Sequence, residues 1–116
     1  MTDFHGPSVY ADQVLARAIR TLAVGSGDVR SRLLTAYSDF NPLTPLHFPE
    51  GLRQDFEWVT QQLTKRGPKL GHDGEVKKGS VEWTLQNIRC TTGVKIAQRL
   101  VFLQEALERY VRSRGE

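Results

Sequence analysis

The chain has 116 residues, of which 39% are hydrophobic and 25% charged, as is ordinary for a soluble globular protein. This length suits one domain and leaves no room for two sizeable cores. A chain of this size buries enough surface to fold without a metal or a disulfide. We therefore exclude collagen-like, disulfide-framed and wholly disordered proteins, and we expect a single domain over residues 1–116.

Charge and cysteine content limit the partners and the location. Sixteen Lys and Arg against thirteen Asp and Glu give a net charge of +3, which does not by itself require a polyanionic partner. A single cysteine, Cys90, cannot form an internal disulfide, and this is typical of a reducing compartment. The first residues lack the features of a signal peptide, and no apolar run has membrane-spanning length. We expect a cytoplasmic protein that does not enter a membrane.

Apolar residues recur at three- and four-residue steps through the first part of the chain, which indicates amphipathic helices. After a flexible N-terminus over residues 1–7, one such stripe extends from Tyr10 to Leu22. Asp28 can then cap a second helix through its carboxylate. Asn41-Pro42 ends that helix, because a residue before proline avoids the helical region.

A third helix and a loop occupy the middle of the chain. Pro49 suits the first turn of the helix, where an N–H group has no partner to lose. The apolar stripe of this helix consists of Leu52, Phe56, Val59 and Leu63. Residues 67–79 contain four glycines and one proline, so we predict a flexible Gly/Lys-rich loop. A short hairpin is the alternative, although apolar and polar residues do not alternate clearly here.

The last third of the chain predicts one or two more helices. Ser80 begins a fourth helix, and Thr91-Thr92-Gly93 either interrupts it or starts a new one. A helix over residues 93–112 has a heptad-like seam, formed by Ile96, Leu100, Leu103, Leu107 and Tyr110. Further apolar residues around this helix favour a central place in the core or a seam shared with a second copy. The predicted fold is all-α, a compact bundle of four or five helices with a long, largely buried C-terminal helix.

Both tryptophans lie away from the apolar stripes of their helices. Because tryptophan is enriched at the centres of interfaces, we interpret the off-stripe aromatic residues as a partner-binding face. This face consists of Trp58, Trp83 and Phe102, with Arg109, Arg112 and Arg114 as a polar rim. The alternative is a second buried cluster of the same aromatic side chains. The expected partner is another protein, or a second copy that binds through the C-terminal helix.

Residues 84–94 (TLQNIRCTTGV) resemble the first helix and turn of a helix-turn-helix DNA-binding motif. The resemblance implies core positions for Leu85 and Ile88, a turn at Gly93 and a recognition helix that begins at Val94. An ordinary helical hairpin with a glycine turn explains the same pattern. The alternative function is thus a nucleic-acid-binding regulator with a degenerate motif around residues 84–100.

Two arginines depart from that motif. Arg89 stands where the motif has a small residue, and Arg99 where the recognition helix has an apolar one. The same region also suits an anion site, since free N–H groups at a helix start attract anions. The residues of this nucleic-acid or anion site are Arg89, Thr91, Thr92, Lys95 and Arg99. Simple N-capping by one of the two threonines is the other explanation.

We predict no catalytic, metal or cofactor site. The histidines His5, His47 and His72 are scattered, and none has a partner at the helical spacing of metal ligands. No titratable pair has the spacing of a general acid and base. An enzyme that uses Cys90 is the most distant alternative, because a free cysteine is usually a small buried hydrophobe. The sequence favours a small interaction or regulatory module, with a homodimer as one form.

Overall fold

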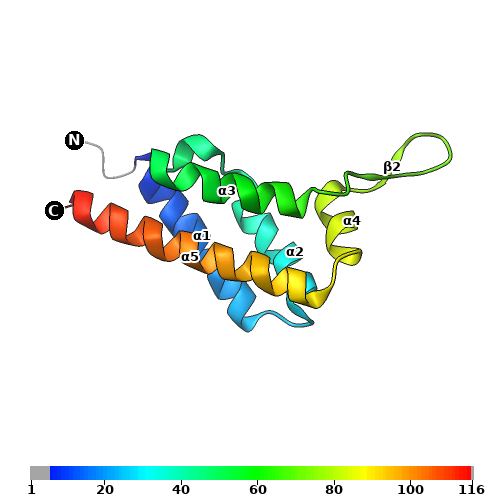
Figure 1. The fold of residues 1–116 in the computed structure, drawn as a ribbon, viewed down its shortest axis with the longest axis horizontal. Helices are drawn as coiled ribbons and strands as arrows, with labels where there is room; N and C mark the ends of the chain where they lie inside the picture. Colours follow the sequence, from blue (N-terminus) through cyan, green and yellow to red (C-terminus); the bar gives the residue numbers. More distant parts are fainter. Residues whose placement is uncertain (1–5, 116) are drawn as a thin grey trace.

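Helices make up most of residues 6–115, the part of the chain that the computed structural model describes (Figure 1). The predicted helical bundle is confirmed, and the described residues contain five α-helices. The elements are α1 (Pro7–Val24), α2 (Val29–Phe40), the 3-10 helix η2 (Pro45–His47), α3 (Glu50–Leu63), β1 (Lys69–Leu70), β2 (Val76–Lys78), α4 (Ser80–Gln86) and α5 (Cys90–Gly115). Of the predicted flexible N-terminus, residues 1–5 lie outside the described part, and Pro7 already belongs to α1.

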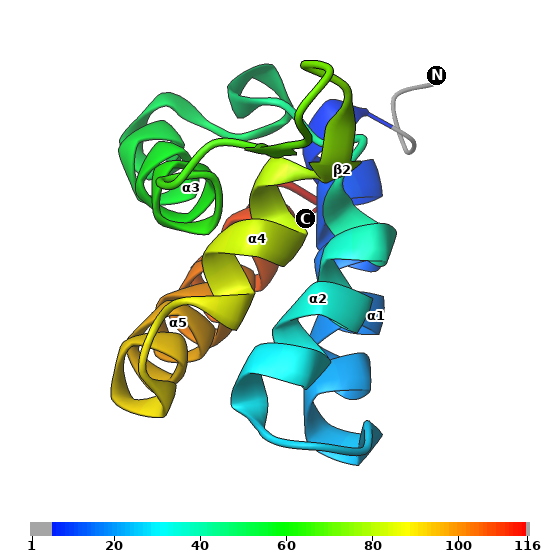
Figure 2. The same cartoon turned by 90° about the vertical axis from the view of Figure 1, so that its right-hand side faces the viewer.

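The core lies where α1, α2 and α3 meet α5. α1 and α2 form an antiparallel pair, and α3 lies beside α5 along the length of the molecule (Figure 1). α4 packs against both α2 and α3 (Figure 2). Each helix contributes one stripe of its apolar residues, as the periodicity predicts. On α3 the stripe is Phe56, Val59 and Leu63, while Leu52 is half-buried.

The capping and the proline break predicted for α2 are confirmed. The Asp28 carboxylate accepts hydrogen bonds from the backbone N–H groups of Arg30 (2.8 Å) and Ser31 (3.3 Å). At the other end, α2 stops at Phe40, and Asn41 is its C-cap. The helix is therefore bounded by local chemistry on both sides.

Residues 67–79 contain a β-hairpin, which was the alternative to the predicted flexible loop. β1 and β2 pair antiparallel, with Lys69 opposite Lys78, and the hairpin projects beyond α4 at one end of the molecule (Figure 1). The turn is closed by a hydrogen bond from Gly71 N to Glu75 O (2.8 Å), and Gly74 has a φ of 83°, which favours glycine. Strands of two and three mostly exposed residues carry no alternation of buried and exposed positions. The sequence therefore contained no strand signal.

The C-terminal region forms two helices with a break at residues 87–89. α5 begins at Cys90, three residues before the predicted start, and extends to Gly115. The seam residues Ile96, Leu100, Leu103 and Leu107 are all fully buried. The fully buried residues of α5 all lie on this side of the helix, and the opposite side is exposed. No helix within residues 6–115 has both the length and the apolar character needed to cross a lipid bilayer.

Candidate protein-interaction surface

The side of α5 opposite the buried seam carries exposed apolar residues. Val94, Val101 and Phe102 expose 43%, 37% and 47% of their surface. At 100° per residue they fall within one arc of the helix. We call this surface the outer face of α5, formed by the exposed residues Val94, Gln98, Val101, Phe102, Glu105 and Arg109. Three of these six residues are apolar, and they are the part of the outer face that a partner would cover.

One flank of the outer face is fixed by a contact between α3 and α5. Arg99 donates from Nη1 to Asp55 Oδ1 at 3.0 Å, and its guanidinium lies 4.5 Å from the centre of the Trp58 ring. Trp58 is half-buried and packs against the core. The charge of Arg99 is thus paired with a carboxylate, and its flat group covers the indole. This contact joins α3 to α5 next to the exposed apolar residues of α5.

A shallow groove of about 620 Å³ continues this surface toward the end of α5. Its walls come from the start of α3 and the last turns of α5. The lining residues are Pro49, Gly51, Leu52, Ala106, Arg109, Tyr110 and Ser113. Arg109, predicted for the polar rim, therefore belongs both to the groove and to the outer face. Arg112 is exposed and bonds Glu108 at 2.8 Å, one turn away.

The predicted partner-binding residues divide between two places. Trp58 is in contact with Arg99, and Phe102 follows Arg99 by one helical turn. Trp58 and Phe102 therefore lie on the side of the molecule where α3 and α5 meet. Trp83 lies on α4 instead, where Lys69 of the hairpin is 4.8 Å from its ring centre. Neither tryptophan is fully buried and Phe102 is exposed, so a second buried cluster of these residues is not present. The hydrophobic periodicity located the aromatic residues but could not show which helices meet.

The residues predicted to bind nucleic acid or an anion lie around the start of α5. Arg89, Thr91 and Lys95 are exposed, and Thr92 is half-buried. Arg99 differs from the prediction, because Asp55 already neutralises its charge. Thr91 and Thr92 lie within the first turn of α5, after its first residue Cys90. The expectation that one of them is the N-cap is therefore wrong.

Gly93 is buried inside α5 and is not a turn residue, which corrects the helix-turn-helix interpretation. A Cβ atom at this position would lie 2.9 Å from Val29 Cγ1 of α2. The glycine therefore permits close contact between α5 and α2, a role that depends on tertiary packing. Since α5 begins at Cys90, Val94 cannot start a recognition helix as the motif requires.

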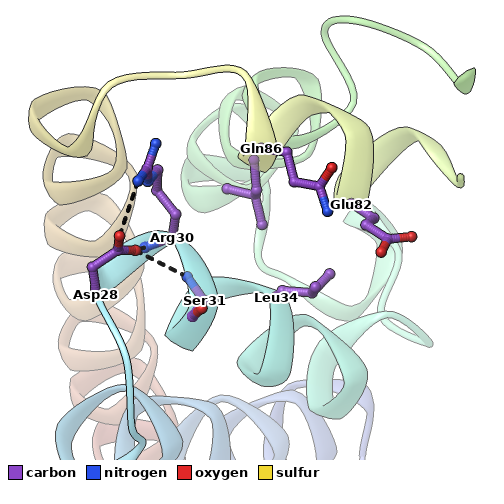
Figure 3. Close-up of a pocket in the computed structure, with 7 residues that line it drawn as sticks. Asp28, Arg30, Ser31, Leu34, Glu82 and Gln86 are labelled. Atoms are coloured by element: carbon purple, nitrogen blue, oxygen red, sulfur yellow. Dashed lines mark hydrogen bonds and ion pairs between the residues drawn. The ribbon is translucent and has the colours of Figure 1, made fainter.

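A small pocket of about 250 Å³ lies between α2 and α4 (Figure 3). Asp28 and Arg30 stand on its α2 side, and Glu82 and Gln86 come from α4. Arg30 bonds Asp28 Oδ2 and the carbonyl oxygen of Ile88, both at 2.9 Å. The hydrogen bond from the Arg30 side chain, with those from the backbone of α2, lowers the pKa of Asp28 to about 2. Asp28 and Arg30 are therefore paired with each other, and the hydrogen bond from Arg30 to Ile88 joins α2 to the α4–α5 turn.

His47 and Cys90 lie on different elements of the described structure, η2 and α5. No group of three His, Cys, Asp or Glu side chains within residues 6–115 is placed to hold a metal ion. His47 accepts a hydrogen bond from the backbone N–H of Thr44 at 3.0 Å. Cys90 is exposed at the start of α5, not buried as expected for a free cysteine. The predicted His5 lies outside the described residues.

Comparison of the chain with protein-family models, with curated proteins and with solved structures finds no match. The outer face of α5 and the groove beside it are thus defined by their geometry alone.

Proposed function

We propose that this protein is a small interaction module of the cytoplasm that binds a second copy of itself through the outer face of α5. The observation that carries the proposal is the row of Val94, Val101 and Phe102 on the exposed side of a helix whose other side is the core. A second copy would cover these side chains, so that α5 becomes largely buried in the dimer. Burial of exposed apolar area is the main driving force for such association.

The charges beside these apolar residues suit an antiparallel pair. Lys95 and Glu105 are both exposed and lie ten residues apart on α5. If two α5 helices cross at the level of residue 100, Lys95 of each copy comes level with Glu105 of the other. Each copy then supplies both charges, as a two-fold symmetric interface requires. Such pairs at the edge of an interface set its orientation more than its strength.

Substitution of Phe102 tests this proposal. Phe102→Glu puts a carboxylate in place of the most exposed apolar side chain of this row, and we expect the dissociation constant of the dimer to rise at least tenfold. Leu46→Glu is the matched control, since Leu46 is a large apolar residue of η2 with 76% exposure. Molar mass from light scattering after size exclusion is the readout. Equal effects of the two variants, or a wild-type monomer at all concentrations, would contradict the proposal.

A further inference from the structure

We propose that the base of the β-hairpin, together with Trp83, binds the phosphodiester backbone of a nucleic acid. This site is independent of the dimer proposed above, because it involves neither the outer face of α5 nor the α3–α5 groove. It also differs from the helix-turn-helix site expected around residues 84–100. The arguments are the distribution of charge, the arrangement of lysines around Trp83 and the shape of the hairpin.

The whole net charge of the chain resides in and next to the hairpin. Residues 65–79 contain five cations, namely Lys65, Arg66, Lys69, Lys77 and Lys78, against Asp73 and Glu75, which gives +3. The remaining eleven cations and eleven anions balance. The ion pairs within residues 6–115 involve Arg30, Arg99 and Arg112, and none of the five hairpin cations. This concentration of positive charge is typical of a surface that binds a polyanion.

Two of these lysines are held close together around an aromatic ring. Lys69 and Lys78 are direct partners across the two strands, an arrangement that repulsion between like charges disfavours. Their Nζ atoms lie 4.8 Å and 6.0 Å from the centre of the Trp83 ring, whose electron-rich face attracts cations. Lys78 also bonds the side chain of Gln86 on α4. The ring and the amide therefore keep two positive charges at one place, where a phosphate group would relieve their repulsion.

The position of the charges within the hairpin favours a nucleic acid over a lipid surface. The cations lie mainly at the base, whereas the turn at the tip contains Asp73 and Glu75. An acidic tip would be repelled from an anionic membrane, and the described hairpin has no Phe, Tyr or Trp side chain to insert into it. A projecting hairpin with a basic base can instead follow a phosphate backbone (Figure 1).

Fluorescence anisotropy with a short labelled DNA duplex and with the matching single strand tests the site. We expect binding at low salt that weakens steeply as salt rises. If all five cations contact phosphates of the duplex, the logarithm of the binding constant should fall against the logarithm of the salt concentration with a slope of about −4.5. The triple variant Lys65→Gln, Lys77→Gln, Lys78→Gln should bind at least tenfold more weakly. Its control, Arg17→Gln, Arg20→Gln, Arg114→Gln, removes three exposed cations elsewhere and should bind within about twofold of wild type.

A second readout does not depend on the triple variant. Trp58→Phe leaves Trp83 as the only tryptophan, so its emission reports on the hairpin base. We expect either oligonucleotide to quench this emission with the same salt dependence as the anisotropy. Three results would overturn the proposal: no binding at low salt, equal losses in the two triple variants, or binding to phosphatidylserine vesicles without binding to oligonucleotides.

Discussion

Gly93 of α5 lies directly against Val29 of α2, so that a Cβ atom on the glycine would come within 2.9 Å of Val29 Cγ1. The next residue of α2, Arg30, reaches the α4–α5 turn and donates to the carbonyl oxygen of Ile88 at 2.9 Å. Close packing and a charged hydrogen bond thus act side by side where the two helices begin. This junction lies at the start of α5, next to Val94, the first residue of the outer face.

Gly93→Ala should therefore destabilise the protein although alanine is the better helix former. Overpacking against the stiff Val29 side chain costs about 1–3 kcal/mol, while the gain in helix propensity is about 1 kcal/mol or less. Gly51→Ala is the control, because no atom lies within 4 Å of its Cβ position on α3. Urea unfolding should show a lower midpoint for Gly93→Ala and an unchanged or higher one for Gly51→Ala. A stabilised Gly93→Ala variant would show that α2 and α5 do not approach this closely.

The Asp28 cap predicts a specific dependence on pH. Its pKa is about 2 in the folded protein against an ordinary 3.8, so the charged carboxylate stabilises α2 above pH 3.8 and this contribution is lost as the pH falls through about 2. Asp28→Asn keeps a capping oxygen but removes the charge. Melting followed by circular dichroism should show the variant less stable than wild type at neutral pH, with a difference that disappears as the pH falls through about 2. A constant difference across this range would contradict the role of the charge.

The local features of the fold were predictable from the sequence, and the contacts between helices were not. The cap at Asp28 and the stop at Asn41-Pro42 depend on neighbouring residues and were found. The role of Gly93 depends on Val29, which lies sixty-four residues earlier in the chain, so a glycine between two helical patterns suggested a turn instead. The hairpin was only an alternative to a flexible loop for a related reason, because β1 and β2 are too short to show alternation.

The candidate site was only partly predictable for the same reason. Helical position alone identified Trp58 and Phe102 as residues outside the main stripes. That Asp55 of α3 would neutralise Arg99 required knowing that α3 and α5 lie side by side. The grouping of Trp83 with the hairpin lysines likewise depends on the fold of a segment predicted to be flexible.

The two tryptophans should differ in their contribution to stability. Trp58 packs against the core and is covered by Arg99, so Trp58→Ala should lower the free energy of unfolding by about 1–2 kcal/mol. Trp83 contacts lysines of the hairpin, and Trp83→Ala should cost at most about 1 kcal/mol. Urea titration of both variants measures the difference. A larger loss for Trp83→Ala would indicate that α4 contributes more to the core than its half-exposed tryptophan suggests.

Charge exchange across α5 tests the antiparallel arrangement of the proposed dimer. Lys95→Glu should weaken the dimer, because each new carboxylate would face Glu105 of the other copy. The double variant Lys95→Glu, Glu105→Lys should restore the association to within about threefold of wild type, since the opposite charges then face each other again. Sedimentation equilibrium at low salt gives the three dissociation constants. Additive losses in the double variant would contradict this register.

The central claim, self-association through an apolar row on α5, is tested most directly by light scattering of the wild-type protein at low and at high salt. The account predicts a species of twice the 13.1 kDa chain mass that persists at high salt, because apolar contacts are not screened by ions. Absorbance at 260 and 280 nm in the same run separates this dimer from a complex with nucleic acid. A species of single-chain mass at both salt concentrations would contradict the claim and would leave Val94, Val101 and Phe102 exposed to solvent.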